Sequence, residues 1–120
     1  MIDCAKKGVM FECKLTPKTT LPFIGIDKTI ASIIDIMNFK VIDSKLRVFN
    51  VQEANFSIKQ LNDFLVGQFP SFKIKFNEDK NFQLVADTWP ESLNCEKAKK
   101  SWNFSSNISL EEFLNSIISK

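Results

Sequence analysis

The sequence predicts a mixed α/β fold, and three local patterns support this prediction. Apolar and charged residues alternate over 72–76, which is the period of a half-buried strand. Isoleucine and methionine recur at helical spacing over 28–38, and Ser109 with Glu112 matches the S-x-x-E box that opens a helix. With 120 residues and 44% hydrophobic content, the chain is long enough for one domain with a core of its own.

The first half of the chain is expected to alternate between helices and strands. Gly8 occupies a position that commonly ends a helix, and Asp27 is a good N-cap for the helix that follows it. The expected elements are a helical tail at 2–7, a strand at 9–15, a turn at 16–20, an extended segment restarting at Leu21-Pro22, an amphipathic helix at 28–38 and a strand at 46–51.

The second half is expected to place two strands between helices. Ser57 caps a helix that Gly67 and Pro70 end. The segment at 82–86 is more continuously apolar than 72–76 and predicts a more deeply buried strand, and the proline of the following Trp-Pro pair cannot continue its ladder. The expected elements are a helix with Ile58, Leu61, Phe64 and Leu65 on one face, strands at 72–76 and 82–86, a short helix at 95–100 capped by Asn94, and a last helix with Leu110, Phe113, Leu114, Ile117 and Ile118 in one stripe.

The composition argues against several classes of function. The sequence has no histidine and no tyrosine, so the usual general base at neutral pH and the usual phenolic proton donor are missing. A net charge of +2, from 16 basic and 14 acidic residues, argues against a dedicated nucleic-acid binder. No apolar run approaches the roughly 20 residues of a membrane helix, and residues 1–15 are charged throughout, so neither a membrane span nor a signal peptide is expected.

The motifs predict neither a metal site nor a nucleotide site. Cys4, Cys13 and Cys95 are widely spaced and have no histidine partner, which favours reduced thiols in an intracellular protein over a zinc site. The only three glycines, at positions 8, 25 and 67, cannot form a G-x-G-x-x-G or Walker loop. The residues by themselves therefore indicate a mixed domain with large apolar helix faces and no recognisable catalytic machinery.

One segment is specific enough to indicate a family. The run Ala86-Asp87-Thr88-Trp89-Pro90, followed by Ala98 and Trp102, resembles the A-D-S-W-P pattern of the short-chain L-threonine 3-dehydrogenases. These enzymes belong to the extended short-chain dehydrogenases, beside the nucleotide-sugar epimerases. Further stretches match the same family in the same order, so the resemblance covers nearly the whole chain. They are Phe11-Glu12-Cys13 with Leu15, Thr19 with Leu21-Pro22, Ile26-Asp27, Phe49-Asn50-Val51 with Phe56-Ser57, and Phe72-Lys73-Ile74.

The resemblance implies that residues 1–120 are a single partial domain, the C-terminal substrate-binding lobe of an extended short-chain dehydrogenase without its N-terminal Rossmann half. In that family the nucleotide loop lies upstream, as does the Y-x-x-x-K pair that takes the hydroxyl proton while hydride passes to NAD. We therefore expect no catalytic residue and no bound NAD in this chain. The complete enzyme oxidises L-threonine to 2-amino-3-oxobutanoate, so L-threonine is expected to bind only when an N-terminal domain completes the site.

The resemblance also bears on partners and compartment. The helices starting at Asp27 and Ser57 would pack partly on the missing NAD-binding domain, so their apolar stripes are expected to be uncovered and to favour association with an intact dehydrogenase subunit. The family's M-M-Y is replaced here by Phe23-Ile24-Gly25, and its Y-N by Phe49-Asn50, which keeps apolar packing and discards hydrogen bonds. Such drift fits a truncated or inactive copy, in a mitochondrial or cytoplasmic location.

The family pattern also suggests site residues. Thr88 and Trp89 are the candidates for lining a substrate pocket, and Thr20, Leu21 and Pro22 are the candidates for the wall of the cleft. The alternatives stay open, since Trp89 also suits a core position and the other three also suit a plain turn. Trp102 is expected in the core.

Two other functions stay open at this stage. A nucleotide-sugar epimerase or reductase lobe would share the superfamily, but Arg47 is the only arginine, and a sugar-diphosphate site usually needs more than one cation. A non-catalytic remnant or interaction module would share the fold without its chemistry.

Overall fold

The computed structural model describes residues 1–39, 48–105 and 108–119, and the chain divides into two compact units. Unit 1 consists of Met1–Leu21 and Phe56–Glu91, and unit 2 consists of Pro22–Asn55 and Ser92–Lys120. Each unit is therefore assembled from two separate stretches of sequence. The described residues contain both helices and strands, interspersed along the chain, which confirms the mixed α/β fold expected from the sequence.

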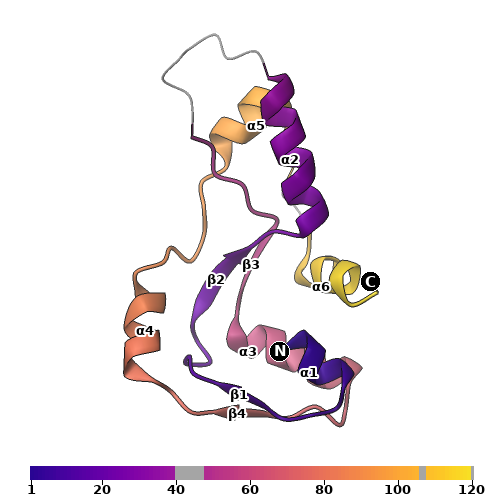
Figure 1. The fold of residues 1–120 in the computed structure, drawn as a ribbon, viewed down its shortest axis with the longest axis vertical. Coiled ribbons are helices and arrows are strands. Elements are labelled where there is room, and N and C mark those ends of the chain that lie inside the picture. Colours follow the sequence, from indigo (N-terminus) through magenta and orange to yellow (C-terminus); the bar gives the residue numbers. More distant parts are fainter. Residues whose placement is uncertain (40–47, 106–107, 120) are drawn as a thin grey trace. The chain divides into compact units, whose positions relative to one another are not determined.

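Unit 1 contains α1 (Ile2–Lys6), β1 (Phe11–Cys13), α3 (Ile58–Gln68), β4 (Ile74–Phe76) and α4 (Lys80–Asp87). The strands β1 and β4 lie side by side in parallel, with Phe11 opposite Ile74 and Cys13 opposite Phe76 (Figure 1). Helix α1 lies beside α3. The strand predicted at 72–76 is thus confirmed over its second half, while β1 is shorter than the predicted 9–15.

Helix α3 carries the core of unit 1. The Ser57 hydroxyl accepts the Gln60 N–H at 3.2 Å, and Gln60 Oε1 accepts the Ser57 N–H at 2.8 Å, so a complete capping box begins the helix where the sequence predicted it. Leu61 is buried on its inner face, and Leu65 and Phe72 are among the most fully buried side chains of the protein. The apolar stripe of α3 is therefore covered within unit 1, and the expectation of an uncovered stripe here was wrong.

Gly8 ends α1 as the sequence predicted. Its φ of +64° lies in the left-handed region that favours glycine. A Cβ at this position would also lie 2.9 Å from Ser71 Oγ, so a larger residue would require the serine to move.

Unit 2 contains α2 (Ile26–Asn38), α5 (Glu96–Trp102) and α6 (Leu110–Ile118). One cluster of its core consists of Cys95, Ala98 and Phe104, each at most 5% exposed. Trp102 is half-buried against this cluster, and its ring lies 4.8 Å from that of Phe49 in an edge-on arrangement. Trp102 was expected in the core, and its side chain is only half-buried there.

Helix α6 begins with the capping box that the sequence predicted at Ser109 and Glu112. The Ser109 hydroxyl accepts the Glu112 N–H at 3.2 Å, and Glu112 Oε2 accepts the Ser109 N–H at 2.8 Å. Phe113 and Leu114 are buried on the inner face of the helix, as their spacing predicted.

Strands β2 (Thr20–Phe23) and β3 (Ala54–Ser57) pair with each other, and the chain passes between the units within both of them. The Ile58 N–H donates to the Thr19 carbonyl at 3.0 Å, and the Glu53 N–H donates to the Phe23 carbonyl at 2.9 Å. The later residue on the β2 side, Phe23, bonds the earlier residue on the β3 side, Glu53, so the two strands are antiparallel. The extended segment predicted at Leu21-Pro22 is confirmed by β2.

The strand predicted at 82–86 was wrong, because this segment is the middle of helix α4. The side chain of Asp79 caps the helix by accepting the N–H groups of Asn81 and Phe82 at 2.9 and 3.3 Å. Four apolar residues within the five of 82–86 fit the period of a strand or of a helix, and the capping aspartate ahead of them favours the helix. Trp89 therefore follows a helix rather than the end of a strand.

The start of α2 also differs from the prediction. Gly25, and not Asp27, is the N-cap residue, and its N–H donates to Glu53 Oε2 at 2.7 Å. This hydrogen bond to Glu53, a residue distant in sequence, fixes the backbone at Gly25, two residues before Asp27. Asp27 lies in the first turn instead, where a negative charge is favourable to the helix dipole.

Three further boundaries were displaced. Residues 48–51 form no strand, and the other two residues of the predicted 46–51 strand lie outside the described residues. Gly67 lies inside α3, which continues for one more residue. Helix α5 runs from Glu96 to Trp102 instead of 95–100, and its N-cap residue is Cys95 and not the predicted Asn94, although the Asn94 side-chain oxygen accepts the Glu96 N–H at 2.9 Å.

The apolar stripe of α2 is exposed, as expected. Ile33 and Ile34 are 54% and 52% exposed and Met37 is 79% exposed, whereas the buried residue of the helix is Ser32. The Ser32 hydroxyl donates to the Lys28 carbonyl, so its own helix satisfies it. In the part of the chain that the structure describes, no helix combines the length and the apolar character needed to cross a membrane.

Candidate functional site around helix α4

Helix α4 and the Trp89 that follows it form a shared wall of two hollows in unit 1. We name them the apolar hollow, of about 340 Å³, and the polar hollow, of about 270 Å³. Ala86 and Trp89 line both of them. Phe82 and Val85, three residues apart on the helix, line the apolar hollow, whereas Gln83 and Asp87, four residues apart, line the polar hollow.

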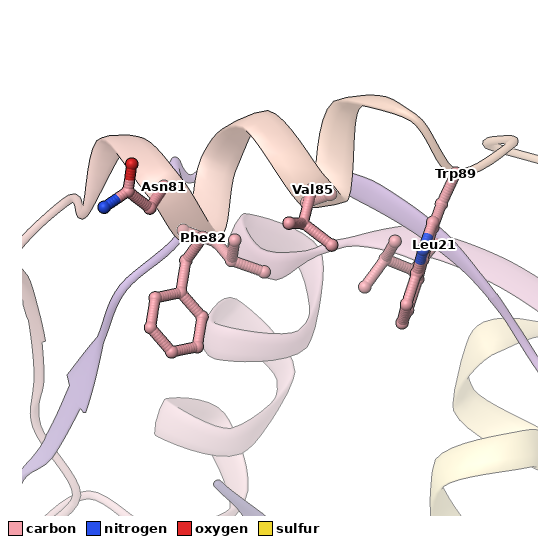
Figure 2. Close-up of a pocket in the computed structure, with 7 residues that line it drawn as sticks. Leu21, Asn81, Phe82, Val85 and Trp89 are labelled. Atoms are coloured by element: carbon pink, nitrogen blue, oxygen red, sulfur yellow. The ribbon is translucent and has the colours of Figure 1, made fainter.

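The apolar hollow lies between α4 and the chain on either side of the 16–20 turn. Figure 2 shows Phe82 and Val85 projecting from the helix toward the space that Leu21 and Trp89 also line. Phe82, Val85 and Trp89 are each 58–60% exposed, so the hollow is a concave apolar surface and not a closed cavity. Its lining residues are Leu15, Leu21, Asn81, Phe82, Val85, Ala86 and Trp89.

The polar hollow combines hydroxyl groups with charges of both signs. Its wall on one side is the segment that leads into β2, and its wall on the other is the C-terminal half of α4 with the residues that follow. The lining residues are Thr16, Lys18, Thr19, Thr20, Gln83, Ala86, Asp87, Trp89 and Glu91.

Gln83 holds these two walls together. Its Oε1 accepts the Thr16 N–H at 2.9 Å, and its amide group also bonds the Thr19 hydroxyl, with contacts at 3.0 and 3.2 Å. Its Nε2 donates to Asp87 Oδ1 at 2.7 Å. Thr19 is buried, so this network replaces the water that its hydroxyl would otherwise need.

The structure places the sequence-predicted site residues unevenly. Trp89 lines both hollows, Thr20 lines the polar one and Leu21 the apolar one. The Thr88 hydroxyl donates to the Val85 carbonyl at 2.7 Å and so completes the end of α4, and Thr88 is not a lining residue of either hollow. Pro22 lies in β2, on the unit 2 side of the boundary, and lines neither of these hollows. The substrate roles assigned to all five stay predictions.

Sequence reasoning missed Gln83, Lys18, Asp87 and Glu91 as members of one surface. The spacing of Gln83 and Asp87 was a usable signal, because residues four apart face each other on a helix. That signal was hidden by the strand predicted over 82–86.

A third hollow, of about 360 Å³, lies in unit 2 and is mostly polar. Gln52 organises it: its Oε1 accepts the Leu93 N–H at 2.7 Å, and its Nε2 donates to the Ser92 hydroxyl at 3.2 Å. Cys95 and Lys99 also line it, and Lys99 pairs with Glu96 at 3.4 Å. The two hydrogen bonds of Gln52 hold it against the segment that precedes α5, which is a structural role.

The residues present do not fit a dinucleotide cofactor. The sequence has three glycines and none of the Gly-rich phosphate loops that hold a pyrophosphate at a helix N-terminus. The described residues also contain no group of three or more histidine, cysteine, aspartate or glutamate side chains placed to hold a metal ion. What the two hollows offer is binding and orientation of a small molecule, through hydroxyls, charges and an aromatic ring.

Known proteins provide the comparison. No family model matches the sequence. The mitochondrial L-threonine 3-dehydrogenase of Sus scrofa is 29% identical over 116 residues, which cover 97% of this chain and 31% of that enzyme. The corresponding enzyme of Bos taurus is 26% identical over 114 residues.

The chain is homologous to part of the L-threonine 3-dehydrogenases. An uncharacterized epimerase/dehydratase of Staphylococcus haemolyticus, 24% identical over 85% of the chain, extends the relationship to that wider group. The chain spans about a third of the length of the curated relatives that it matches.

Solved structures show the same fold. The GalE-like L-threonine dehydrogenase of Cupriavidus necator superposes with a TM-score of 0.86 over 99% of this chain and 39% of its own, at 23% identity. L-threonine 3-dehydrogenase of Trypanosoma brucei superposes with a TM-score of 0.82 over 98% of the chain, at 21% identity. The resemblance inferred from the A-D-T-W-P segment is thus confirmed, and the fold is that of a portion of these enzymes.

Proposed function

We propose that this chain is the substrate-binding portion of an NAD-dependent oxidoreductase of the L-threonine 3-dehydrogenase type. The observation that carries the proposal is the match to threonine dehydrogenases over nearly the whole chain, in sequence and in fold. The two hollows around α4 support it, because Ala86 and Trp89 of the segment that carries the family resemblance line both of them, and Asp87 lines the polar one. The mitochondrial relatives favour a mitochondrial or cytoplasmic location for the chain.

In this proposal the chain binds and orients the substrate, and it performs no proton transfer itself. NAD, when bound by a complete enzyme, supplies the hydride acceptor. Trp89 would close the hollow over the substrate, Thr20 would offer a hydroxyl, and Leu21 would keep the apolar side dry. Thr88 and Pro22 would act indirectly, by shaping the end of α4 and the course of β2.

The proposal is tested by exchange into a complete enzyme. This chain would replace the matching portion of the Cupriavidus necator dehydrogenase, and NAD-dependent oxidation of L-threonine would be measured. We expect activity, and a loss of at least about tenfold in kcat/KM, or roughly 1.4 kcal/mol, for Trp89→Ala. Leu84→Ala is the matched control, because Leu84 is an exposed apolar residue of the same helix outside both hollows. A chimera that folds and binds NAD but oxidises no L-threonine would contradict the proposal.

The chain alone should not turn over L-threonine with NAD. It contains no tyrosine and no histidine, so the family's proton acceptor cannot be supplied from these 120 residues. NAD-dependent formation of 2-amino-3-oxobutanoate by the purified chain, above a blank without protein, would refute this part of the proposal.

The exposed stripe of α2 favours a second candidate function, as a module that associates with a dehydrogenase subunit. Ile30, Ile33 and Met37 are at least half exposed on one face of the helix. We expect sedimentation to show association that Ile33→Glu with Met37→Glu abolishes, while Lys97→Glu on α5 leaves it intact. A compact monomer at all concentrations, with or without an intact dehydrogenase present, would count against this candidate.

A nucleotide-sugar substrate is the remaining alternative, and the match to two uncharacterized epimerase/dehydratases keeps it open. The same chimera distinguishes it, because a sugar-nucleotide enzyme would act on a nucleotide sugar and leave L-threonine unchanged.

A further inference from the structure

Helix α2 leaves its apolar side chains in solvent and buries a small polar one. Four apolar residues, which we name the α2 stripe, are each at least half exposed: Ile26, Ile30, Ile33 and Met37. The residue that the helix buries is Ser32, at 3% exposure. Apolar side chains gain free energy when they leave water, so this inverted pattern indicates that a partner covers the stripe.

The spacing of the α2 stripe is the same in both directions along the helix. Its members follow one another at intervals of four, three and four residues, which keeps them in one row on the helix surface. A two-fold axis through the middle of this row places Ile30 opposite Ile33 of a second copy. The same axis places Ile26 opposite Met37 of the second copy, so every side chain of the stripe meets another apolar side chain.

The charged residues of α2 do not obstruct such a pair. The stripe itself has no charged member, so two copies can meet along it without burying a charge. Asp35 is two residues from Ile33 and from Met37, and residues two apart do not share a side of a helix. Lys28 is engaged away from the stripe, because its Nζ lies 5.2 Å from the centroid of the Phe104 ring.

The helix dipole favours the antiparallel arrangement of the two helices. An antiparallel pair brings the positive N-terminal end of one α2 beside the negative C-terminal end of the other, whereas a parallel pair brings like ends together. The last turn of α2 contains no basic residue, so its own side chains do not neutralise the negative end.

The length of α2 limits the strength of the contact. A helix of 13 residues is about 20 Å long. A pair of such helices buries less area than a standard interface of about 1,200–2,000 Å², so we expect a dissociation constant on the order of 100 μM. At the low micromolar concentrations of a denaturation experiment the chain is therefore a single copy.

We propose that the α2 stripe is a self-association surface, at which two copies of this chain pair through antiparallel α2 helices. Ile30 and Ile33 form the centre of the interface, and Ile26 and Met37 form its ends. The inference goes beyond the proposed function, because it concerns assembly and depends on no substrate. The occupant also differs from that of the second candidate function, in which the partner is a dehydrogenase subunit.

Sedimentation equilibrium of the 120-residue chain tests the pairing, over a concentration range of about 10 μM to 1 mM. We expect the average mass to rise from that of one copy toward that of two. Ile33→Glu should raise the dissociation constant at least about tenfold, because it places a charge against Ile30 of the second copy. Ala31→Glu is the matched control, since Ala31 is exposed on the same helix but outside the row, and should leave the constant unchanged.

Two variants that fail alone should associate when they are mixed. Ile30→Lys and Ile33→Glu each leave an unpaired charge in a pair of like copies. In an antiparallel mixed pair the introduced lysine faces the introduced glutamate, and the remaining isoleucines face each other. We expect the mixture to associate at least about fivefold more tightly than either variant alone. This recovery also shows that both variants are folded.

The opposite register has its own mixture. Ile30→Lys and Ile30→Glu bring their charges together only in a parallel pair, so this mixture should not associate. Recovery here, and not in the first mixture, would overturn the antiparallel pairing.

Three further results would overturn the inference. A chain that stays a single copy over the whole concentration range does not self-associate. A single-copy chain that binds an intact dehydrogenase, and loses this binding with Ile33→Glu, assigns the stripe to that partner. Equal weakening by Ala31→Glu and Ile33→Glu places the contact outside the stripe.

Discussion

At the scale of single residues, Gln83 joins segments of unit 1 that no motif in the sequence indicated as neighbours. Its amide bonds the Thr16 backbone, the buried Thr19 hydroxyl and the Asp87 carboxylate. Thr16 and Gln83 are 67 residues apart, so no local pattern can reveal this contact. The glutamine matters because two segments distant in sequence reach hydrogen-bonding distance only in the folded chain.

Gln83→Leu should destabilise unit 1. The substitution leaves the buried Thr19 hydroxyl and the Thr16 N–H without this partner, which costs about 1–3 kcal/mol for unsatisfied polar groups. Urea denaturation measures the change in the free energy of unfolding. Gln68→Leu, at the exposed end of α3, is the control and should change stability by less than about 0.5 kcal/mol. Equal effects of the two substitutions would show that the network contributes nothing measurable.

At the scale of elements, the predictions that succeeded depend on neighbours in sequence. The capping boxes at Ser57 and Ser109 each join residues three apart, so the sequence contains the whole interaction. The prediction over 82–86 failed because a segment of five residues, four of them apolar, does not distinguish the period of a strand from that of a helix. The start of α2 failed because Glu53, 28 residues from Gly25, supplies the decisive hydrogen bond.

Truncating an apolar side chain should lower the free energy of unfolding much more in α3 than in α2. Leu65→Ala in α3 removes a side chain that is 0% exposed and should cost about 2–5 kcal/mol, because it leaves a cavity. Ile33→Ala in α2 removes a side chain that is 54% exposed and should change the free energy of unfolding by less than about 1 kcal/mol. Thermal and urea denaturation provide the comparison. A large cost at Ile33 would mean that the α2 face is covered in solution.

The capping box of α6 should make this helix sensitive to acid. Hydrogen bonds from the Ser109 backbone and hydroxyl hold the pKa of Glu112 below its usual value of 4.5. A lowered folded-state pKa contributes stability that is fully present above 4.5 and is lost as the pH falls through the folded value. An NMR titration of Glu112 measures its pKa. The backbone chemical shifts of α6, followed below pH 4.5, report any loss of the helix.

Glu112→Gln is the matching variant, because the amide oxygen can still accept the Ser109 N–H but does not titrate over this range. In this variant the backbone chemical shifts of α6 should not change with pH below 4.5. An unchanged acid transition of α6 in this variant would assign the effect to another carboxylate.

At the scale of the whole molecule, the family could be inferred from the sequence while the shape of the site could not. Asp87, Thr88 and Trp89 gave the resemblance because they are contiguous. The hollows required the 16–21 segment to meet α4, which is a property of the fold. Thr88 was a candidate for lining the pocket because of the family resemblance, and in the structure its hydroxyl donates to the Val85 carbonyl at the end of α4.

The two units should differ in their protection from hydrogen exchange. Unit 1 surrounds α3 with fully buried residues, and slow exchange follows from backbone bonds that only a large opening exposes. Helix α2 of unit 2 buries Ser32 and leaves its isoleucines exposed, so few apolar contacts oppose its local opening. We expect the Leu65 amide to exchange at least about tenfold more slowly than the Ile34 amide, after correction for intrinsic rates. Equal protection, lost together when urea is added, would instead mean that the chain opens as one cooperative body and that the exposed stripe weakens no element.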